Sequence, residues 1–440
     1  MAKKKMTLEE KLEEAIVKDN PYEVPENWVW SKLSGIAGEF QYGYTAKASI
    51  DDTGVKYIRI TDLSNGMINF SSAPYCKIND NDYEKYKLIE NDILIARMGS
   101  VGENGMVIND DQVGVFASYL IRIKPWIDSK YLMYILQSSL YWNQIYNNKK
   151  GTTRANINAN TLRELVIPIP PLKEQQRIVD KIESLFEKLD RATELIEEAR
   201  DDFEKRKSAI LERAIMGKYI PGVKLTKVEL GNILSFKNGM SKRSGKEGKE
   251  TKVLRLADVS NDDIYSESAR SMLLTEKEIT NYKVEDGDLL IIRVNGTKKN
   301  VGKAIEYVGK DVCTYCDHLI RIDCSETNRS YIKYLINSDN VRRQIDELIV
   351  SSAGQNTISQ SSLNKIKTMW VEDNKIQEKI VGVINNFINR EKSIDVLTKL
   401  EEIELMKKSI LAKAFRGQLG TNCEEDESAL ELLKEVLSKE

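Results

Sequence analysis

The sequence has one histidine, five cysteines and no long apolar run, and each shortage argues against a class of protein. A Ser-His-Asp hydrolase could be built only at His318, and a lone histidine beside an expected strand is more often structural. So few cysteines in 440 residues fit reduced thiols better than a disulfide framework. No stretch is long and apolar enough for a membrane span or a secretory signal, so we expect a cytoplasmic protein.

The net charge of −2 counts mildly against nucleic-acid binding, but the charges are unevenly distributed. Seven basic residues and two acidic ones lie between Lys237 and Arg255, which is a local patch able to attract phosphate. From Thr421 to the end there are seven acidic residues and only two lysines. We expect this last stretch to be a solvated, disordered tail.

The chain contains an internal repeat of about 200 residues. Corresponding segments occur in the same order at offsets of 196 to 202 residues, which chance would not produce. The matched pairs are 58–62 with 254–258, 91–97 with 287–293, 120–123 with 319–322, 151–158 with 353–359, and 207–211 with 407–411. Each copy begins with short apolar and β-branched runs bounded by Gly, Asn and Asp, which indicate strands, and ends in a helical stretch.

Motifs for catalysis are missing or defective. Two stretches near Gly239 and Gly296 resemble P-loops, but each has five residues between its glycines and lacks the hydroxyl that binds Mg²⁺. Asn20-Pro21-Tyr22 resembles an adenine-methyltransferase motif only superficially, because no glycine-rich cofactor loop accompanies it. Cys313, Cys316, His318 and Cys324 could form a zinc cluster, but the first copy has no ligands in that place, so we expect no metal.

Three pairs of loops carry the residue types that read base edges and hold phosphates. Arg59 and Arg255 are weaker candidates, because each precedes an aspartate with which it is expected to pair. The predicted DNA-contacting residues of the first copy are Gln41, Tyr44, Thr45, Lys47, Arg97, Ser100, Arg154, Asn156 and Asn158. Those of the second copy are Lys237, Asn238, Lys242, Arg243, Arg293, Asn295, Lys298, Lys299, Gln355 and Asn356.

The helical stretch of each copy carries apolar residues at alternating spacings of three and four, as in a coiled-coil seam. The first seam contains Ile178, Ile182, Leu185, Leu189, Ile196, Phe203 and Ile210. The second, less regular seam contains Ile380, Ile384, Phe387, Ile394, Ile403 and Ile410. Antiparallel pairing of the two seams would put the strand-rich parts at opposite ends of a rod; the alternative is that each helix packs on its own domain.

Three segments resemble the type I restriction-modification DNA specificity subunits. The stretch 165–179, with Pro168, Pro170 and Pro171, is similar to the opening of that family's central spacer helix. Residues 409–419 resemble the end of its distal helix, and Pro25-Glu26-Asn27-Trp28 resembles its usual lead-in. The resemblance extends from about Tyr22 to Leu419.

This resemblance implies an α+β fold with two strand-rich target recognition domains, two long antiparallel coiled-coil helices and a pseudo-two-fold internal repeat. It also implies a non-catalytic chain that reads a bipartite DNA site. Two modification subunits, which bind S-adenosylmethionine and methylate adenine N6, would be its partners, together with restriction subunits driven by ATP and requiring Mg²⁺; this chain itself would hold no cofactor. The expected parts are an N-terminal extension (1–21), the first recognition domain (22–171), the central spacer (172–217), the second recognition domain (218–374), the distal spacer (375–419) and the acidic tail (420–440).

The second copy departs from the family pattern, since no proline follows Pro221 and Met369–Gln377 stands where the first copy has its proline signature. We therefore expect the second spacer helix to begin differently. Its heavier basic loops suggest that the second domain depends more on phosphate contacts. The rival hypothesis is a coiled-coil scaffold whose two heads bind protein.

Overall fold

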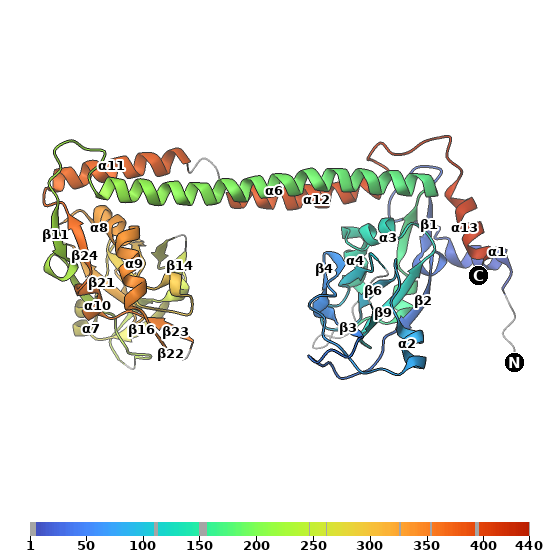
Figure 1. Ribbon diagram of the computed structural model, residues 1–440, viewed down its shortest axis with the longest axis horizontal. Helices are drawn as coiled ribbons and strands as arrows, with labels where there is room; N and C mark the ends of the chain where they lie inside the picture. The colour runs from blue at the N-terminus through green and yellow to red at the C-terminus, as the bar shows by residue number, and fades with distance from the viewer. Residues whose placement is uncertain are drawn as a thin grey trace. The chain divides into compact units, whose positions relative to one another are not determined.

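The computed structural model describes residues 6–109, 113–148, 156–245, 247–260, 262–324, 327–352, 354–391 and 396–439. The chain divides into two compact units. Unit 1 contains residues 1–196 and 397–440, and unit 2 contains residues 197–396. Each combines sheets with helices (Figure 1). No helix in the described ranges has the length and apolar character needed to cross a membrane.

Unit 1 is built on a six-stranded sheet with the order β2-β9-β6-β7-β5-β4. Its neighbours are antiparallel except for the parallel pair of β7 and β5. The strands are β2 (Ala37–Tyr42), β4 (Leu63–Ser64), β5 (Gly66–Ile68), β6 (Ile93–Ala96), β7 (Asn104–Met106) and β9 (Leu120–Pro125). Two smaller sheets pair β1 (Val29–Lys32) with β10 (Val166–Ile169) and β3 (Lys56–Ile58) with β8 (Gly114–Phe116).

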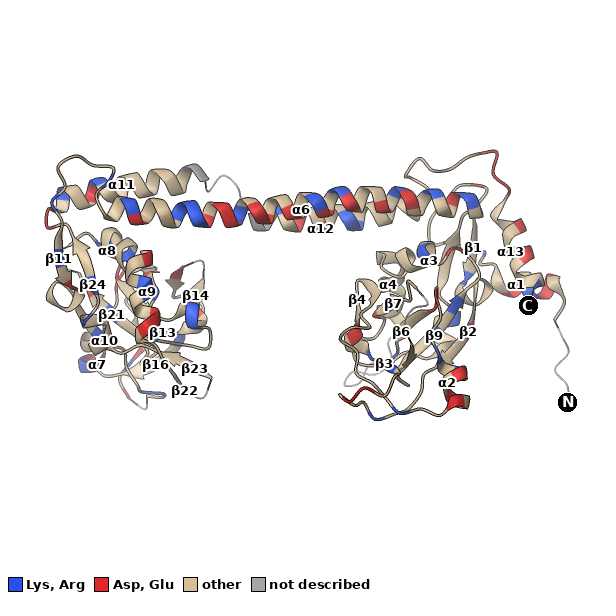
Figure 2. Ribbon diagram, viewed as in Figure 1, with Lys and Arg blue, Asp and Glu red and all other residues tan. Residues whose placement is uncertain are grey.

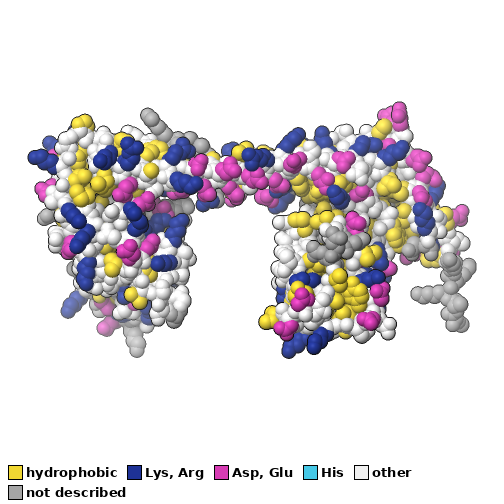
Figure 3. All heavy atoms as spheres, in the orientation of Figure 1, with side chains coloured by type: hydrophobic (Ala, Val, Ile, Leu, Met, Phe, Trp, Pro, Cys, Tyr) yellow, Lys and Arg dark blue, Asp and Glu magenta, His cyan; other side chains and the backbone are white. Residues whose placement is uncertain are grey.

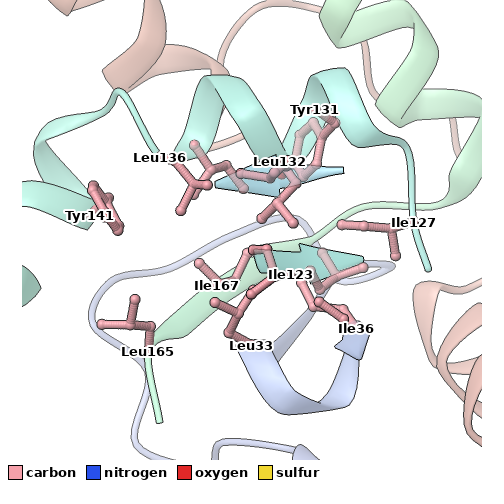
Figure 4. Close-up of a cluster of buried hydrophobic side chains, with 14 of the residues drawn as sticks. Leu33, Ile36, Ile123, Ile127, Tyr131, Leu132, Leu136, Tyr141, Leu165 and Ile167 are labelled. Carbon is pink, nitrogen blue, oxygen red and sulfur yellow. The ribbon is translucent and has the colours of Figure 1, made fainter. Parts of the chain in front are cut away.

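Strand β6 is apolar throughout because both faces of the sheet are covered. Its side chains alternate between the faces. Ile93 and Ile95 join the larger core, while Leu94 and Ala96 join a second core on the other side. Figure 4 shows part of the larger core, where Ile123 of β9 and Ile167 of β10 lie below Leu132.

Short helices complete unit 1. They are α1 (Leu8–Ala15), η1 (Leu33–Gly35), η2 (Ile60–Asp62), α2 (Asp80–Tyr86), α3 (Ser129–Ile135), α4 (Ser139–Asn148) and α5 (Ala159–Arg163). Side-chain caps begin several of them; the side chain of Asp128, for example, accepts from the Tyr131 N–H at the start of α3. Buried Leu132 and Ile145 show that α3 and α4 supply part of the larger core.

Unit 2 repeats this topology. Its six-stranded sheet has the order β12-β21-β17-β19-β15-β14, again with one parallel pair, β19 with β15. These strands are β12 (Ser235–Asn238), β14 (Val259–Ser260), β15 (Asp263–Tyr265), β17 (Leu289–Ile292), β19 (Ala304–Val308) and β21 (Leu319–Asp323). The side chains of β17 alternate between two cores as those of β6 do. The internal repeat predicted from the sequence is thus visible as two sheets with the same strand order.

Most of the remaining elements of unit 2 have counterparts in unit 1. The strands are β11 (Thr226–Glu229), β13 (Lys249–Leu254), β16 (Arg270–Leu274), β18 (Val294–Asn295), β20 (Thr314–Tyr315), β22 (Val350–Ser352), β23 (Gln355–Thr357) and β24 (Lys367–Trp370). The helices are η3 (Leu230–Asn232), η4 (Leu256–Asp258), α7 (Glu276–Tyr282), η5 (Lys298–Asn300), α8 (Arg329–Ile336), α9 (Asp339–Leu348) and α10 (Gln360–Asn364). Strand β11 pairs with β24 as β1 pairs with β10. Elements β16, β18, β22, β23 and η5 have no counterparts among the elements described in unit 1.

One continuous helix, α6 (Leu172–Ile215), contributes residues to both units. Charged residues of both signs alternate along its surface (Figure 2). In unit 1 it lies antiparallel to α12 (Val396–Ala414), because Asp190 forms an ion pair of 2.7 Å with Lys407 while Ile178 shares a core with Phe415. In unit 2 it lies antiparallel to α11 (Asn374–Glu391): Phe203 stacks on Phe387 at 6.0 Å, and Leu211 shares a core with Ile380.

The predicted seam residues lie mainly in these two helix pairs. Ile178, Ile182, Ile380, Ile384 and Ile403 are buried. Leu185, Leu189, Ile196, Phe203, Ile210, Phe387 and Ile410 are half-buried, and Ile394 lies outside the described residues. The predicted α+β fold with two strand-rich domains and a long spacer helix is therefore confirmed, and the described part of the second spacer consists of two helices, α11 and α12, each antiparallel to α6.

The expectation that the second spacer helix begins differently from the first is wrong, because equivalent hydrogen bonds hold the backbone at both helix starts. Gln175 accepts a hydrogen bond from the Asp128 N–H and donates to the Pro170 carbonyl, at 3.0 and 2.9 Å. Gln377 accepts from the Asn328 N–H and donates to the Val371 carbonyl, at 3.2 and 2.7 Å. An aspartate supports the second helix where a proline supports the first, since the side chain of Asp373 accepts from the backbone of Lys375.

The expected disordered tail is also wrong. This stretch contains helix α13 (Ala429–Ser438), whose buried Ala429, Leu433 and Leu437 join the larger core of unit 1. The acidic segment before it is also held, because the buried carboxylate of Glu174 accepts from the Thr421 hydroxyl, the Asn422 amide and the Trp28 indole. Charge counting missed the apolar face of α13, whose leucines recur at helical spacing.

Candidate nucleic-acid interface

Two loops predicted to contact DNA are joined at one edge of unit 1. The loop after β6 and the segment before α5 meet where Met98 forms a β-bridge with Asn156. The Ile157 N–H donates to the Arg97 carbonyl at 2.9 Å. Gly99 and Gly102, with φ of +72° and +95°, let the first loop turn back sharply. The backbone thus holds Arg97 and Asn156 next to each other.

Arg97 is held over an aromatic ring. Its guanidinium carbon lies 4.7 Å from the ring centre of Tyr42, and the Tyr42 hydroxyl accepts from the Ala159 N–H at 3.1 Å. The Arg97 Nε is buried and has no hydrogen-bond partner among the described residues. Cation–π contact and backbone pairing therefore fix this guanidinium without a hydrogen bond from its side chain to another described residue.

The equivalent loops of unit 2 are joined more extensively. Strand β18 pairs with β23, placing Asn295 opposite Asn356, and β23 forms a hairpin with β22. The Asn356 side-chain amide donates to the Gly296 carbonyl at 2.9 Å. The Ile358 N–H donates to the Arg293 carbonyl at 3.0 Å, as the Ile157 N–H does to Arg97. Strands β22 and β23 lie at the end of unit 2 away from α11 (Figure 1).

Arg293 is held by polar contacts instead of an aromatic ring. Its Nη1 donates to the backbone carbonyl of Asp317 at 2.9 Å. The carboxylate of Asp317 is in turn paired with both Nη atoms of Arg243, at 2.9 and 3.1 Å. Two predicted DNA-contacting arginines of unit 2 therefore share one aspartate, which limits what they can offer to a ligand.

Gln41 and Lys237 lie opposite arginines in the sheets, the buried Arg122 and the half-buried Arg321. Gln41 pairs in register with Arg122, whose guanidinium it accepts from, and Lys237 pairs in register with Arg321. The Lys237 ammonium donates to the carbonyl of Asn281 at 2.6 Å. Protein partners therefore occupy both side chains. Gln41 and Lys237 are residues of paired strands and do not lie in free loops.

Lys242 is also occupied. It forms a bidentate ion pair with Glu278 at 2.8 and 3.0 Å, and this lysine holds the pKa of Glu278 at about 2. Asn238 is half-buried, and its Oδ1 has no partner within the described part of the chain. The ring of Tyr44 packs against Tyr86 at 5.5 Å.

The other predicted residues remain accessible or are used locally. Asn158 caps α5, since its side chain accepts from the Thr161 N–H at 2.9 Å. Arg154 lies outside the described residues. Six exposed side chains form no hydrogen bond or ion pair with other described residues: Thr45, Lys47, Ser100, Lys298, Lys299 and Gln355.

Arg59 and Arg255 are paired as predicted. Arg59 Nε lies 3.1 Å from Asp62, and Arg255 Nη2 lies 3.4 Å from Asp258. Both aspartates are buried. These equivalent pairs stabilise the turn that follows β3 and β13.

No metal site is present in the ranges that the structure describes, since no three His, Cys, Asp or Glu side chains there could hold an ion. Cys313, Cys316 and Cys324 are buried free thiols. Burial raises the pKa of all three. The Cys313 sulfur lies 3.2 Å from the Tyr307 hydroxyl.

Sequence reasoning missed two residues of this region. Tyr42 lies in sequence between the predicted residues Gln41 and Tyr44, but only the structure shows that its ring supports Arg97. Arg342 lies on α9, where regular helical spacing gives no indication of a binding role. Its place beside the loop of Lys299 depends on tertiary packing.

Comparisons with known proteins agree with this architecture. Residues 25–200 match the family described as the type I restriction modification DNA specificity domain. The chain is 28% identical to the type I restriction enzyme StySPI specificity subunit of Salmonella potsdam, over 91% of each chain. It is 26% identical to the EcoKI specificity subunit of Escherichia coli, over 90% of each.

Two solved structures share the fold. A chain from work on complex assembly and conformational transition of the type I R-M system has a TM-score of 0.68 at 21% identity, covering 91% of this chain and 100% of that one. The HsdS subunit from Thermoanaerobacter tengcongensis has a TM-score of 0.54 at 19% identity, covering 92% and 100%. In sequence the chain is thus similar to type I restriction-modification DNA specificity subunits over about nine tenths of its length, and in fold it is similar to solved structures of that kind.

Proposed function

We propose that this chain reads the DNA sequence for a type I restriction-modification complex, with each unit reading one part of a bipartite site. The observation that carries the proposal is the paired loops present in both units, joined at Met98–Asn156 in one and at Asn295–Asn356 in the other. Pairing two loops on a rigid sheet fixes polar side chains at one edge, as direct reading of base edges requires.

The two units should read different half-sites, because their paired loops carry different residues. Unit 1 offers Arg97 on its tyrosine, with exposed Ser100 and Asn156. Unit 2 offers Asn295 and the exposed Gln355. Base readout depends on the donor and acceptor pattern of such side chains, so unequal loops favour unequal sequences.

Arg97 is the strongest single candidate for base contact. An arginine makes its most specific DNA contact by donating two hydrogen bonds to the O6 and N7 of guanine. The ring of Tyr42 holds the guanidinium in one orientation, which lowers the entropy lost on binding. We therefore assign Arg97 to a guanine in the half-site read by unit 1.

The chemistry would belong to partner chains. The P-loop look-alikes lack the required spacing and hydroxyl, and the sequence carries no cofactor loop for methyl transfer. Two modification subunits would bind S-adenosylmethionine and methylate adenine N6, and restriction subunits would use ATP and Mg²⁺. The helix pairs that α6 forms with α11 and α12 would serve as the ruler that sets the gap between the half-sites.

Methylation mapping tests this function. The chain is purified with its modification partner, incubated with genomic DNA and S-adenosylmethionine, and the methylated adenines are located by single-molecule sequencing. We expect a motif in two parts separated by a gap of fixed length. A single contiguous motif, or none, would contradict the proposal, and a partner complex without DNA affinity would favour the protein-binding scaffold.

A further inference from the structure

Unit 2 contains a pocket of about 740 Å³ between α6, α9 and the turn η5. We call it the Arg342 pocket. Six basic and five acidic residues line it. The basic residues are Lys207, Lys298, Lys299, Lys303, Lys333 and Arg342. Figure 3 shows side chains of both signs on the visible face of this unit.

Half of these cations are already neutralised by protein carboxylates. Lys303 pairs with Asp262, Lys333 with Asp263 and Lys207 with Glu204. Lys298, Lys299 and Arg342 form no ion pair with any residue in the described ranges. The unpaired positive charge of the pocket is thus concentrated on η5 and on the facing side of α9.

Arg342 is only half used by the protein. Its Nη2 donates to the Lys299 carbonyl at 2.9 Å, which ties α9 to η5. Its Nη1 is buried and has no hydrogen-bond partner among the described residues. Nη1 lies against Gly302, so this packing and the bond to Lys299 fix the guanidinium charge beside the pocket, where it attracts an anion.

Unit 1 has no such group in the equivalent place. The Cα of Gly102 faces Ile145 and Trp142, and that of Gly302 faces Ile345 and Arg342. Trp142 therefore occupies the position of Arg342. The cationic pocket is a property of unit 2 alone and is not required by the shared fold.

The pocket is continuous with the candidate DNA-reading loops. Lys298 follows Asn295 by three residues, and Asn295 is paired with Asn356 in the joined loops. A ligand that touches both regions must present hydrogen-bonding edges beside negative charge. The phosphodiester backbone of DNA does this, since its phosphates flank the bases that the loops would read.

We propose that the Arg342 pocket binds a phosphate group of the DNA backbone beside the half-site read by unit 2, with the ammonium groups of Lys298 and Lys299 as its donors and the fixed guanidinium charge of Arg342 beside them. This inference rests on the proposed DNA-reading function. It gives the two units different ways of holding DNA, with the phosphate clamp in unit 2 only.

The test measures the salt dependence of DNA binding by the complex with its modification subunits. A duplex carrying the mapped site and a duplex of unrelated sequence are titrated between low and moderate salt. We expect Arg342→Gln to reduce the slope of log affinity against log salt by about one. Affinity for both duplexes should fall by the same factor, roughly tenfold, and the methylated motif should not change.

Charge-matched variants control for the loss of positive charge alone. Lys375 lies at the far end of α11 from Ile388, which lines the pocket, so Lys375→Gln is compared with Arg342→Gln. The double variant Lys298→Gln/Lys299→Gln changes two exposed side chains and is compared with Lys310→Gln/Lys375→Gln. Its result does not depend on the packing of Arg342. If the salt slopes of the pocket variants equal those of their controls, the inference is wrong, even if inorganic phosphate stabilises the protein. Failure of the wild-type complex to bind DNA would instead overturn the proposed function.

Discussion

Units 1 and 2 have the same strand order but hold their equivalent arginines in opposite ways. In unit 1, Arg97 rests on the ring of Tyr42; in unit 2, Arg293 donates to the carbonyl of Asp317. The six-stranded sheets are buried on both faces, so their sequences are constrained by packing. The loops and the helix surfaces beside them lack this constraint, and there the two units have diverged.

The largest expected difference concerns the buried Glu174, which ties the C-terminal segment to unit 1 and corresponds to Ile376 in unit 2. Glu174→Ala should destabilise unit 1 by about 3 kcal/mol, because two buried donors, the Trp28 indole and the Thr421 hydroxyl, lose their acceptor. Hydrogen exchange of β6 against β17 during urea unfolding measures the two units separately. The half-exposed Glu183, paired with Lys130, is the control and should cost under about 1 kcal/mol. Equal losses in both units would contradict the asymmetry.

The second prediction separates the two reading arginines. Arg97→Met should reduce methylation of the wild-type site by roughly 10- to 100-fold and relax one base pair, from about 1–3 kcal/mol of lost discrimination. Arg293→Met should relax the motif less, because Arg293 Nη1 already donates to a backbone carbonyl. Methylome sequencing of both variants measures the methylated motif of each. If Arg293→Met relaxes the motif more than Arg97→Met does, the assigned roles are reversed.

The third prediction concerns the position at which α4 carries Trp142 and α9 carries Arg342. Trp142 packs against Tyr141 and Tyr146 at 5.5 and 5.8 Å. Trp142→Arg should destabilise unit 1 by about 1–2 kcal/mol, because aromatic packing is lost and no anion compensates in the absence of DNA. Trp142→Phe is the control and should cost less in the same denaturant titration. An unchanged midpoint for Trp142→Arg would show that this site tolerates either chemistry.

The smallest expected effect depends on pH. Lys242 and the capping interactions of Thr275 lower the pKa of Glu278 from 4.5 to about 2. The stabilisation is therefore present above pH 4.5 and is lost as the pH falls toward 2. Glu278→Gln should flatten the acid dependence of hydrogen exchange in α7, and the exposed Glu276→Gln should not. If the two variants have identical pH profiles, the ion pair of Lys242 with Glu278 does not cause the acid dependence of α7.

The fold was largely predictable because apolar periodicity reports burial directly. The runs that became β6 and β17 are apolar at every position, and the spacing of Ile178, Ile182 and Leu185 indicated a helix pair. Charge composition was a poorer guide. It identified a tail of acidic residues but not the apolar face of α13, which packs on the core.

The candidate site was only partly predictable, since loop contacts depend on which segments tertiary structure brings together. The repeat matched the loops of one unit to their equivalents in the other, but nothing local shows that Gln41 faces Arg122 or that Lys242 is neutralised by Glu278. The start of the second helix was mispredicted for a related reason. Proline was treated as necessary there, whereas Asp373 supports the same backbone geometry through its side chain.

The discontinuous composition of unit 1 has a consequence for synthesis on the ribosome. Unit 2 is one continuous stretch, whereas unit 1 needs residues 397–440 to complete its core. Unit 2 can therefore fold while the chain is still being made, although its residues are translated after most of unit 1. Unit 1 must wait a few seconds longer, at about 5–20 residues per second, for the last segment to emerge. During that interval its nascent form exposes the apolar surface that α12 and α13 later cover, which makes it the part of the chain in greatest need of a chaperone.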